Sequence, residues 1–171
     1  MTNKEERPAG CVLRLFGAPE QTVQKAVAAL PDTWQGTVHC RSRGAETLVA
    51  LQAQSPSGLK KAAQALRQAF SADLYGAGET TLPAAVVEAL ERHDKLLICA
   101  DAAAGALLEA RLENLPGAEK VFDFGAVSYA NPKTGPLIEK RARLPKDCTD
   151  PLRQALARAQ AARRVVGADL S

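Results

Sequence analysis

Apolar positions in the first half of the chain switch between a helical and an extended spacing. Residues 12–16, 37–41 and 46–53 alternate apolar and polar side chains, which is typical of half-buried β-strands. Between and after them, apolar residues return every three or four positions, which predicts helices at 19–30 and after Ser57, the expected N-cap. The second helix has the clearest amphipathic face, made by Leu59, Ala62, Ala63, Leu66, Ala69 and Phe70.

These elements follow one another in the order β-α-β-β-α, with Gly44 in the turn of the predicted hairpin. We assign this module to residues 11–76 and expect the polar residues 1–10 before it to be disordered. Residues 73–80 are rich in turn formers and predict a junction, which leaves a second domain over 81–171. The predicted fold class is therefore α/β, or α+β for the chain taken as a whole.

The second domain is predicted to open with a helix that Thr81 can cap and that packs through Val86, Val87 and Leu90. Two mostly apolar runs follow, at 95–100 and 121–129. Continuous apolar strands of this kind are typical of a parallel sheet that is covered on both faces.

The last third of the chain predicts a loop and a helix. Asparagine, proline and glycine residues at 131–136 indicate a loop. Asp147 or Thr149 is expected to cap the final helix, which has Pro151 at its start. One side of that helix is apolar, with Leu152, Ala155, Leu156 and Ala159.

The most informative stretch lies between the apolar run 95–100 and a helical pattern over 106–112. It reads Asp101-Ala102-Ala103-Ala104-Gly105, so the order is strand, tight turn and helix. Unpaired backbone N–H groups and the positive end of the helix dipole meet at a helix N-terminus, and such turns hold phosphates and oxyanions.

Several pieces of the chain, in order, resemble the CinA (competence/damage-inducible) family, whose C-terminal domains include nicotinamide-nucleotide amidases. The resemblance implies a KH-type middle domain over 11–76 and a C-terminal amidase-type α/β domain over 81–171. The pieces that carry it are Leu13-Arg14-Leu15-Phe16-Gly17, Leu74-Tyr75-Gly76, the loop 101–105, Leu115-Pro116-Gly117-Ala118, Gly125-Ala126-Val127, and Tyr129 with Asn131.

The resemblance also shows what this loop lacks. In the family it reads Glu-Ser-Cys-Thr-Gly-Gly, and its serine is the nucleophile. Here Asp101 stands at the glutamate and Ala102 at the serine, and a methyl group cannot attack an amide carbon. The resemblance therefore implies no catalytic residue and at most a vestigial ligand site, made by Asp101, Ala103, Ala104, Gly105, Tyr129, Asn131 and Lys133.

Two further differences from the family point the same way. Thr134 stands where the family usually has a lysine, with Lys133 one residue away. The family's Gly-Ala-Asp leads into a strand and a Thr-Gly-Ile-Ala-Gly-Pro loop, whereas this sequence stops at 167–171. We therefore expect a truncated domain, in which Ala102→Ser alone would not restore activity because the site stays open to water.

Composition narrows the classes of partner and cofactor. No apolar run approaches the ~20 residues of a membrane span, and the N-terminus lacks the apolar core of a signal peptide. We therefore expect a cytoplasmic protein without a membrane partner. No cofactor is expected, and no metal, because the cysteines have neither CxxC spacing nor a histidine cluster nearby; they are Cys11, Cys40, Cys99 and Cys148.

The net charge of +3 is mild, but eight basic residues against three acidic ones gather over 139–164. A solvated helix face is the ordinary explanation of such a run. That stretch contains no aromatic residue for base stacking, and the chain contains no GXXG loop of the RNA-binding KH type. No specific nucleic-acid partner is expected.

Self-association is the expected partnership. The chain has only four Phe, two Tyr and one Trp for its core. Few helices are predicted within 81–171, too few to cover both faces and the open edge of its sheet, which favours pairing with a second copy. We predict a homo-oligomer, most simply a dimer, with the contact at Leu107, Leu108, Val127, Leu152 and Leu156.

Two functions remain open at this point. The leading hypothesis is a non-catalytic, truncated CinA-like protein that acts through self-association or partner binding. The alternative is a nicotinamide mononucleotide amidase or sensor, with backbone N–H groups of 103–106 on the phosphate of the nucleotide. A product without any selected role is a third reading that the residues leave open.

Overall fold

The computed structural model describes residues 9–31, 34–100, 102–123, 132–145 and 147–171, and of residues 102–105 it describes the backbone alone. The chain divides into two compact units, Met1–Leu82 and Pro83–Ser171. Both combine helices with extended segments, which confirms a mixed α/β protein.

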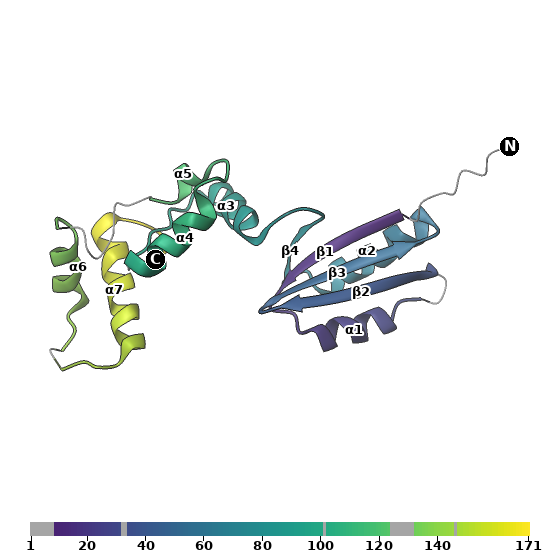
Figure 1. Cartoon of the computed structure of the whole chain (residues 1–171), viewed down its shortest axis with the longest axis horizontal. Helices are drawn as coiled ribbons and strands as arrows, with labels where there is room; N and C mark the ends of the chain where they lie inside the picture. The colour runs from purple at the N-terminus through teal and green to yellow at the C-terminus, as the bar shows by residue number, and fades with distance from the viewer. Residues whose placement is uncertain (1–8, 32–33, 101, 124–131, 146) are drawn as a thin grey trace. The chain divides into compact units, whose positions relative to one another are not determined.

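The first unit is a four-stranded antiparallel sheet with the strand order β2-β3-β1-β4 (Figure 1). Because helices follow the first and third strands, the order along the chain is β-α-β-β-α-β, a split arrangement of the ferredoxin-like kind. The bounds are β1 Ala9–Phe16, α1 Glu20–Ala28, β2 Gly36–Arg43, β3 Glu46–Ala53, α2 Pro56–Ala69 and β4 Leu74–Ala77.

The predicted hairpin is confirmed, and the predicted junction is partly wrong. β2 and β3 pair from Gly36↔Ala53 to Arg43↔Glu46, and Gly44 turns the chain at a φ of 61°. Within 73–80, however, β4 pairs with the outer edge of β1, and the Gly78 N–H donates to the Val12 carbonyl over 2.9 Å. β4 is too short for an alternation of apolar and polar residues to predict it from the sequence. Its pairing partner, β1, is distant along the chain.

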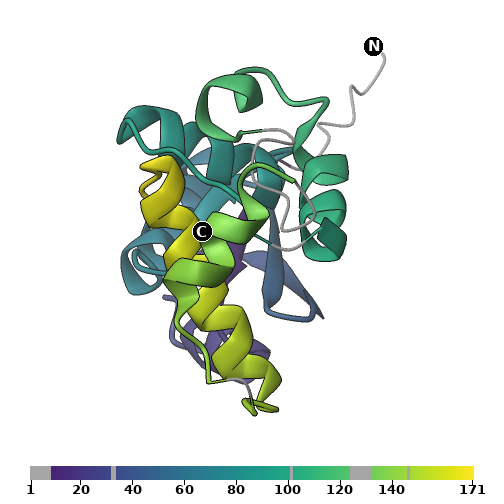
Figure 2. The ribbon, with the colours of Figure 1, turned by 90° about the vertical axis from the view of Figure 1, so that its left-hand side faces the viewer.

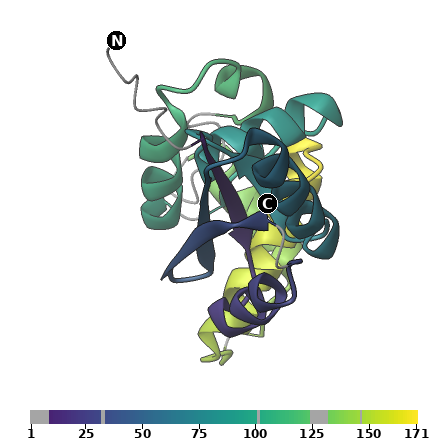
Figure 3. The same cartoon turned by 90° about the vertical axis from the view of Figure 1, so that its right-hand side faces the viewer.

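Alternate residues of the sheet build the core of this unit. In β3 the inward side chains include Val49 and Leu51, which pack with α1 and α2 on one face of the sheet (Figure 3). Thr47 is the buried polar residue on this face, and its hydroxyl donates to the Ala18 carbonyl over 3.0 Å. The burial cost of that hydroxyl is thereby offset.

Two helices begin at a different cap from the predicted one. Ser55, and not Ser57, caps α2, because its Oγ accepts from the Gly58 N–H over 3.3 Å. Asp150, and not Asp147 or Thr149, caps the last helix. In both cases a proline occupies the first helical position, so the residue directly before that proline becomes the N-cap.

Five helices and a short set of parallel pairings form the described part of the second unit. Two helices were missed. α5 ends at Val121, where the sequence predicted the start of the second apolar run, and α6 begins directly after the turn at 132–134, where it predicted only a loop. Gly135 and Pro136 break helices in their interior but are tolerated in a first turn. The bounds are α3 Leu82–Arg92, α4 Ala102–Leu112, α5 Ala118–Val121, α6 Gly135–Ala142 and α7 Pro151–Val166.

The predicted strand at 95–100 is reduced to isolated parallel bridges around Leu97. On one side Leu97 bridges to Phe122, with its N–H donating to the Val121 carbonyl over 2.8 Å. On the other side Leu97 bridges to Leu170, and the Ile98 N–H donates to the Leu170 carbonyl over 3.1 Å. The segment 95–98 is therefore central, between 121–123 and 168–170.

Helices cover both faces of this central segment. Leu97 and Cys99 pack in one apolar cluster with α3, α4 and α5, which includes Val87, Leu90, Leu112 and Phe122. Leu96, Ile98 and Ala100 pack in another with α6 and α7, around Ile138, Ala161 and Ala162. The expectation that the chain has too few helices to cover both faces is wrong, because α6, which the sequence did not predict, packs against α7 (Figure 2).

Candidate functional site

The loop that the sequence singled out lies at the carboxyl end of the central parallel segment. Segment 95–98 leads through Ala100 to α4, which begins at Ala102, so residues 102–105 form the first turn of that helix. Asp123 lies beside this end, and its N–H donates to the Leu97 carbonyl over 3.2 Å. Ligand sites of parallel α/β sheets lie at this end of the strands.

The structure describes only part of the predicted ligand set. The backbone of Ala103, Ala104 and Gly105 lies in the first turn of α4, while Asp101, Tyr129 and Asn131 lie outside the described residues, as does Val127 of the predicted contact. Lys133 is exposed in the turn before α6, and Thr134 is the residue before the first turn of that helix. The predicted set therefore lies only partly within the described residues and stays a prediction.

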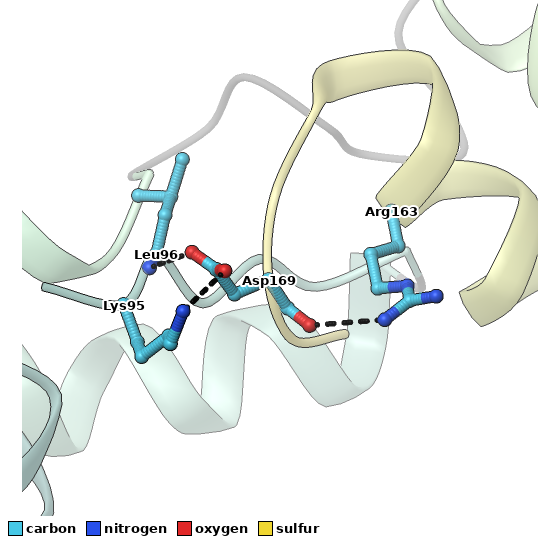
Figure 4. A network of polar contacts seen from close by, with 4 residues as sticks. All are labelled: Lys95, Leu96, Arg163 and Asp169. Atoms are coloured by element: carbon cyan, nitrogen blue, oxygen red, sulfur yellow. Dashed lines mark hydrogen bonds and ion pairs between the residues drawn. The ribbon is translucent and has the colours of Figure 1, made fainter. Parts of the chain in front are cut away.

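Asp169 ties the last residues of the chain to the central segment (Figure 4). Its Oδ1 accepts from the Lys95 ammonium over 2.9 Å, and its Oδ2 accepts from the Leu96 N–H over 3.0 Å. The Arg163 guanidinium donates to the Asp169 backbone carbonyl over 3.2 Å. The sequence marked this aspartate only as part of a Gly-Ala-Asp resemblance and did not predict its partners.

The electrostatic consequence is a lowered pKa of the Asp169 carboxyl. The hydrogen bond from the Leu96 N–H is the largest cause, followed by the hydrogen bond from Lys95. Both favour the charged carboxylate. The parallel pairing at Leu97 and Leu170 is thus clamped by a charge-assisted contact at its start.

An apolar hollow opens beside this clamp, between α3 and the last residues of the chain. Its volume is about 590 Å³. Val86, which the sequence placed in the packing face of α3, is 38% exposed here, whereas Val87 and Leu90 are buried as predicted. The lining residues are Val86, Ala89, Leu90, His93, Lys95, Asp169 and Leu170.

Two kinds of feature are absent from the described residues: a cluster of metal ligands and a membrane-spanning helix. The described residues contain no group of three or more His, Cys, Asp or Glu side chains that suits a metal ion. None of the helices in the described part of the chain combines the length and the apolar character that a bilayer span requires.

The second unit thus has the features of an α/β domain in which a central parallel segment is followed by the N-terminus of a helix. A family model for the CinA C-terminal domain matches residues 79–171. Because this match spans more than half of the sequence, the chain belongs to the CinA family.

Similar, longer proteins agree with this assignment. A CinA-like protein of Desulfovibrio desulfuricans is 31% identical over 129 residues, which are 72% of this chain and 30% of that protein. A CinA-like protein of Anaeromyxobacter sp. is 31% identical over 132 residues, 74% of this chain and 32% of that protein. A Clostridium botulinum protein, provisionally described as competence-damage inducible, is 30% identical over 127 residues, 70% of this chain and 31% of that protein. The chain spans about a third of the length of the curated relatives that it matches.

Proposed function

We propose that this chain is a non-catalytic CinA-family protein that acts through self-association. The observation that carries the proposal is the identity of residue 102, the first residue of α4, which is alanine. By the resemblance of the loop, this is the position of the family's serine nucleophile. An alanine side chain has no lone pair with which to form a covalent intermediate.

The test is turnover of nicotinamide mononucleotide, the substrate class that the family resemblance suggests. The purified chain should release no ammonia above a buffer blank. Turnover above the blank that is lost in Asp101→Ala or Tyr129→Ala would overturn the non-catalytic proposal. Ala102→Ser, measured beside it, should also stay near the blank, because a serine needs a base to take its proton.

Binding without turnover would favour the alternative function, a nucleotide sensor. Its support is the first turn of α4, where backbone N–H groups without helical partners suit a phosphate. Calorimetric titration with nicotinamide mononucleotide separates the two functions. Saturable binding would support the sensor. The absence of a heat of binding would favour the protein that acts through self-association.

Self-association is supported by three exposed leucines of the second unit. Leu152 and Leu156 are 77% and 58% exposed on α7, and Leu107 is 71% exposed on α4. Leu152 and Leu156 are one turn apart on the helix, with Ala155 exposed between them. A leucine stripe with small neighbours is suited to close packing against a copy of itself, and a two-fold contact needs only one such patch.

We also propose that the first unit is the KH-type middle domain of the family and that it does not read RNA. Its support is that the relatives match more of the chain than residues 79–171, so the similarity reaches into the first unit. No GXXG sequence, which grips the RNA backbone in KH domains, occurs in the chain.

A further inference from the structure

Four cations line one hollow between the helices α6 and α7. We call it the basic hollow; its lining residues are Leu137, Lys140, Arg141, Arg143 and Arg164, and its volume is about 630 Å³. The first four come from α6 and the residue after it, whereas Arg164 comes from the last turn of α7, more than twenty positions later in the chain. Small-molecule sites have volumes of about 300–1,000 Å³.

The described lining of the basic hollow includes no acidic residue. α6 and α7 contain a single acidic residue, Glu139. Its carboxylate accepts from the Arg158 Nε over 2.8 Å, and Glu139 is not among the lining residues. Asp150, before α7, is occupied in capping that helix. The described residues that line the hollow thus include four cations and no carboxylate, which concentrates positive charge there.

The backbone of Arg143 is a second observation on the basic hollow. It ends α6 in the left-handed conformation, with φ 50° and ψ 39°. This C-terminal position ordinarily takes glycine, because a Cβ is strained there. Strained backbone of this kind clusters at ligand sites, and in this chain it also occurs at Gln35 and Asp94. Arg143 lines the basic hollow, and the backbone at the end of α6 is strained because this residue is not glycine.

The helix dipole alone does not account for this arrangement. Lys140 and Arg141 lie in the last turn of α6, and Arg164 lies in the last turn of α7, where basic side chains are favourable. That effect acts within each helix separately. It does not require cations of two helices to line one hollow, and it does not require a strained Arg143.

We propose that the basic hollow is a binding site for a small ligand that carries a chain of two or more phosphates. Several cations around one hollow match several phosphoryl charges, and the planar guanidinium fork of arginine binds phosphate oxygens in pairs. Leu137, half exposed at the edge, offers an apolar contact for a group attached to the phosphates. The site uses other residues than the first turn of α4 and does not depend on the proposed function.

The test is calorimetric titration of the full chain with inorganic tripolyphosphate. We expect saturable binding, and Arg164→Ala should weaken it about tenfold or more, the equivalent of one lost charge-assisted hydrogen bond. Arg153→Ala is the matched control, because Arg153 is an exposed residue of α7 outside the hollow and its loss changes the net charge equally. The control should change the affinity less than about twofold.

Arg143→Gly separates binding from folding. Glycine suits the left-handed position, so the melting temperature of this variant should be equal to or above that of the unchanged chain, while tripolyphosphate binding is lost. Binding that survives both Arg143→Gly and Arg164→Ala would overturn the proposal. An equal effect of Arg153→Ala would also overturn it, since the charge would then act diffusely.

The source of the phosphate chain is decided by two further titrations. Adenosine triphosphate that binds more tightly than tripolyphosphate would assign the ligand to nucleotides, with Leu137 in contact with the attached group. Equal affinities would assign it to the phosphates alone. A single-stranded oligonucleotide that binds while tripolyphosphate does not would overturn the proposal of a small-ligand site.

Discussion

At the scale of single residues, Asp169 shows how one carboxylate holds a chain segment in place. Its two oxygens accept hydrogen bonds from the Leu96 N–H and the Lys95 ammonium, both in the central segment. The backbone N–H groups of Asp169 and Leu170 in turn donate to the Leu96 carbonyl, each over 3.0 Å. Side chain and backbone thus fasten the same pairing.

Asp169→Asn is predicted to lower the melting temperature at neutral pH. The pKa of the folded carboxyl is below its ordinary value, so the charged form stabilises the fold. This contribution is present above about pH 4, the ordinary pKa of an aspartate, and is lost as the pH falls through the folded pKa. The difference between the two proteins should therefore shrink as the pH falls below about 4.

Thermal melts followed by circular dichroism at neutral and acidic pH check this. Asp94→Asn, at an exposed turn position, is the control for the loss of one charge and should leave the melting temperature at neutral pH nearly unchanged. An Asp169→Asn protein that melts like the unchanged chain at neutral pH would show that the contact with Lys95 and Leu96 contributes nothing to stability.

At the scale of elements, the caps decide where helices begin. The Asp150 carboxylate accepts from the N–H groups of Leu152 and Arg153 over 3.0 and 3.3 Å. Pro151, which lies between Asp150 and Leu152, has no N–H that needs a partner. The local order Asp-Pro therefore starts α7, although Thr149 and Asp147 are also residue types that cap helices.

Asp150→Ala is predicted to lower the free energy of unfolding by about 1 kcal/mol, within the usual range of about 0.5–2 kcal/mol for a lost N-cap. Thr149→Ala, at the exposed neighbouring position, should change it by less than about 0.5 kcal/mol. Urea titrations of both variants measure these differences. A larger effect at Thr149 would return the cap to the position that the sequence suggested.

At the scale of the whole molecule, the exposed leucine stripe predicts a dimer. Burying two leucines at a contact stabilises it by about 1.5–3 kcal/mol each. Leu152→Lys with Leu156→Lys should therefore raise the dimer dissociation constant by about a hundredfold or more. Sedimentation at micromolar concentration measures this, with Phe16→Thr, an exposed apolar residue of the first unit, as control. A chain that is a folded monomer on its own would contradict the prediction.

Nucleic-acid binding is predicted to be weak and indifferent to sequence. Eight basic residues over 139–164 attract phosphates, but that stretch offers no aromatic side chain on which a base can stack. Any association with RNA should fall steeply as salt rises, because it depends on released counterions. Anisotropy titrations with RNAs of different sequence at physiological salt measure this, and tight, selective binding would contradict it.

The sequence predicted those helices and strands whose pattern of apolar residues lies within one short segment of the chain. The strands and helices of the first unit up to α2 follow from alternation and helical spacing within each segment, and the structure confirms them. The expectation of disorder over 1–10 is wrong for Ala9 and Gly10, because both belong to β1 and pair with β3. The strand β4 and the helix α6 did not follow, because β4 is paired by β1 and Ile138 of α6 is buried against Ala161 and Ala162 of α7. Their partners lie outside the local window.

By itself, the sequence determined the alanine at position 102, the strand-loop-helix order around it and the family resemblance, since these are properties of residues and their neighbours in the chain. The tertiary structure alone decided that helices cover both faces of the segment 95–98 and that Arg164 shares a hollow with Arg143. The physical reason is that packing and the convergence of charge join residues that are distant along the chain, and no local spacing encodes which distant residues meet.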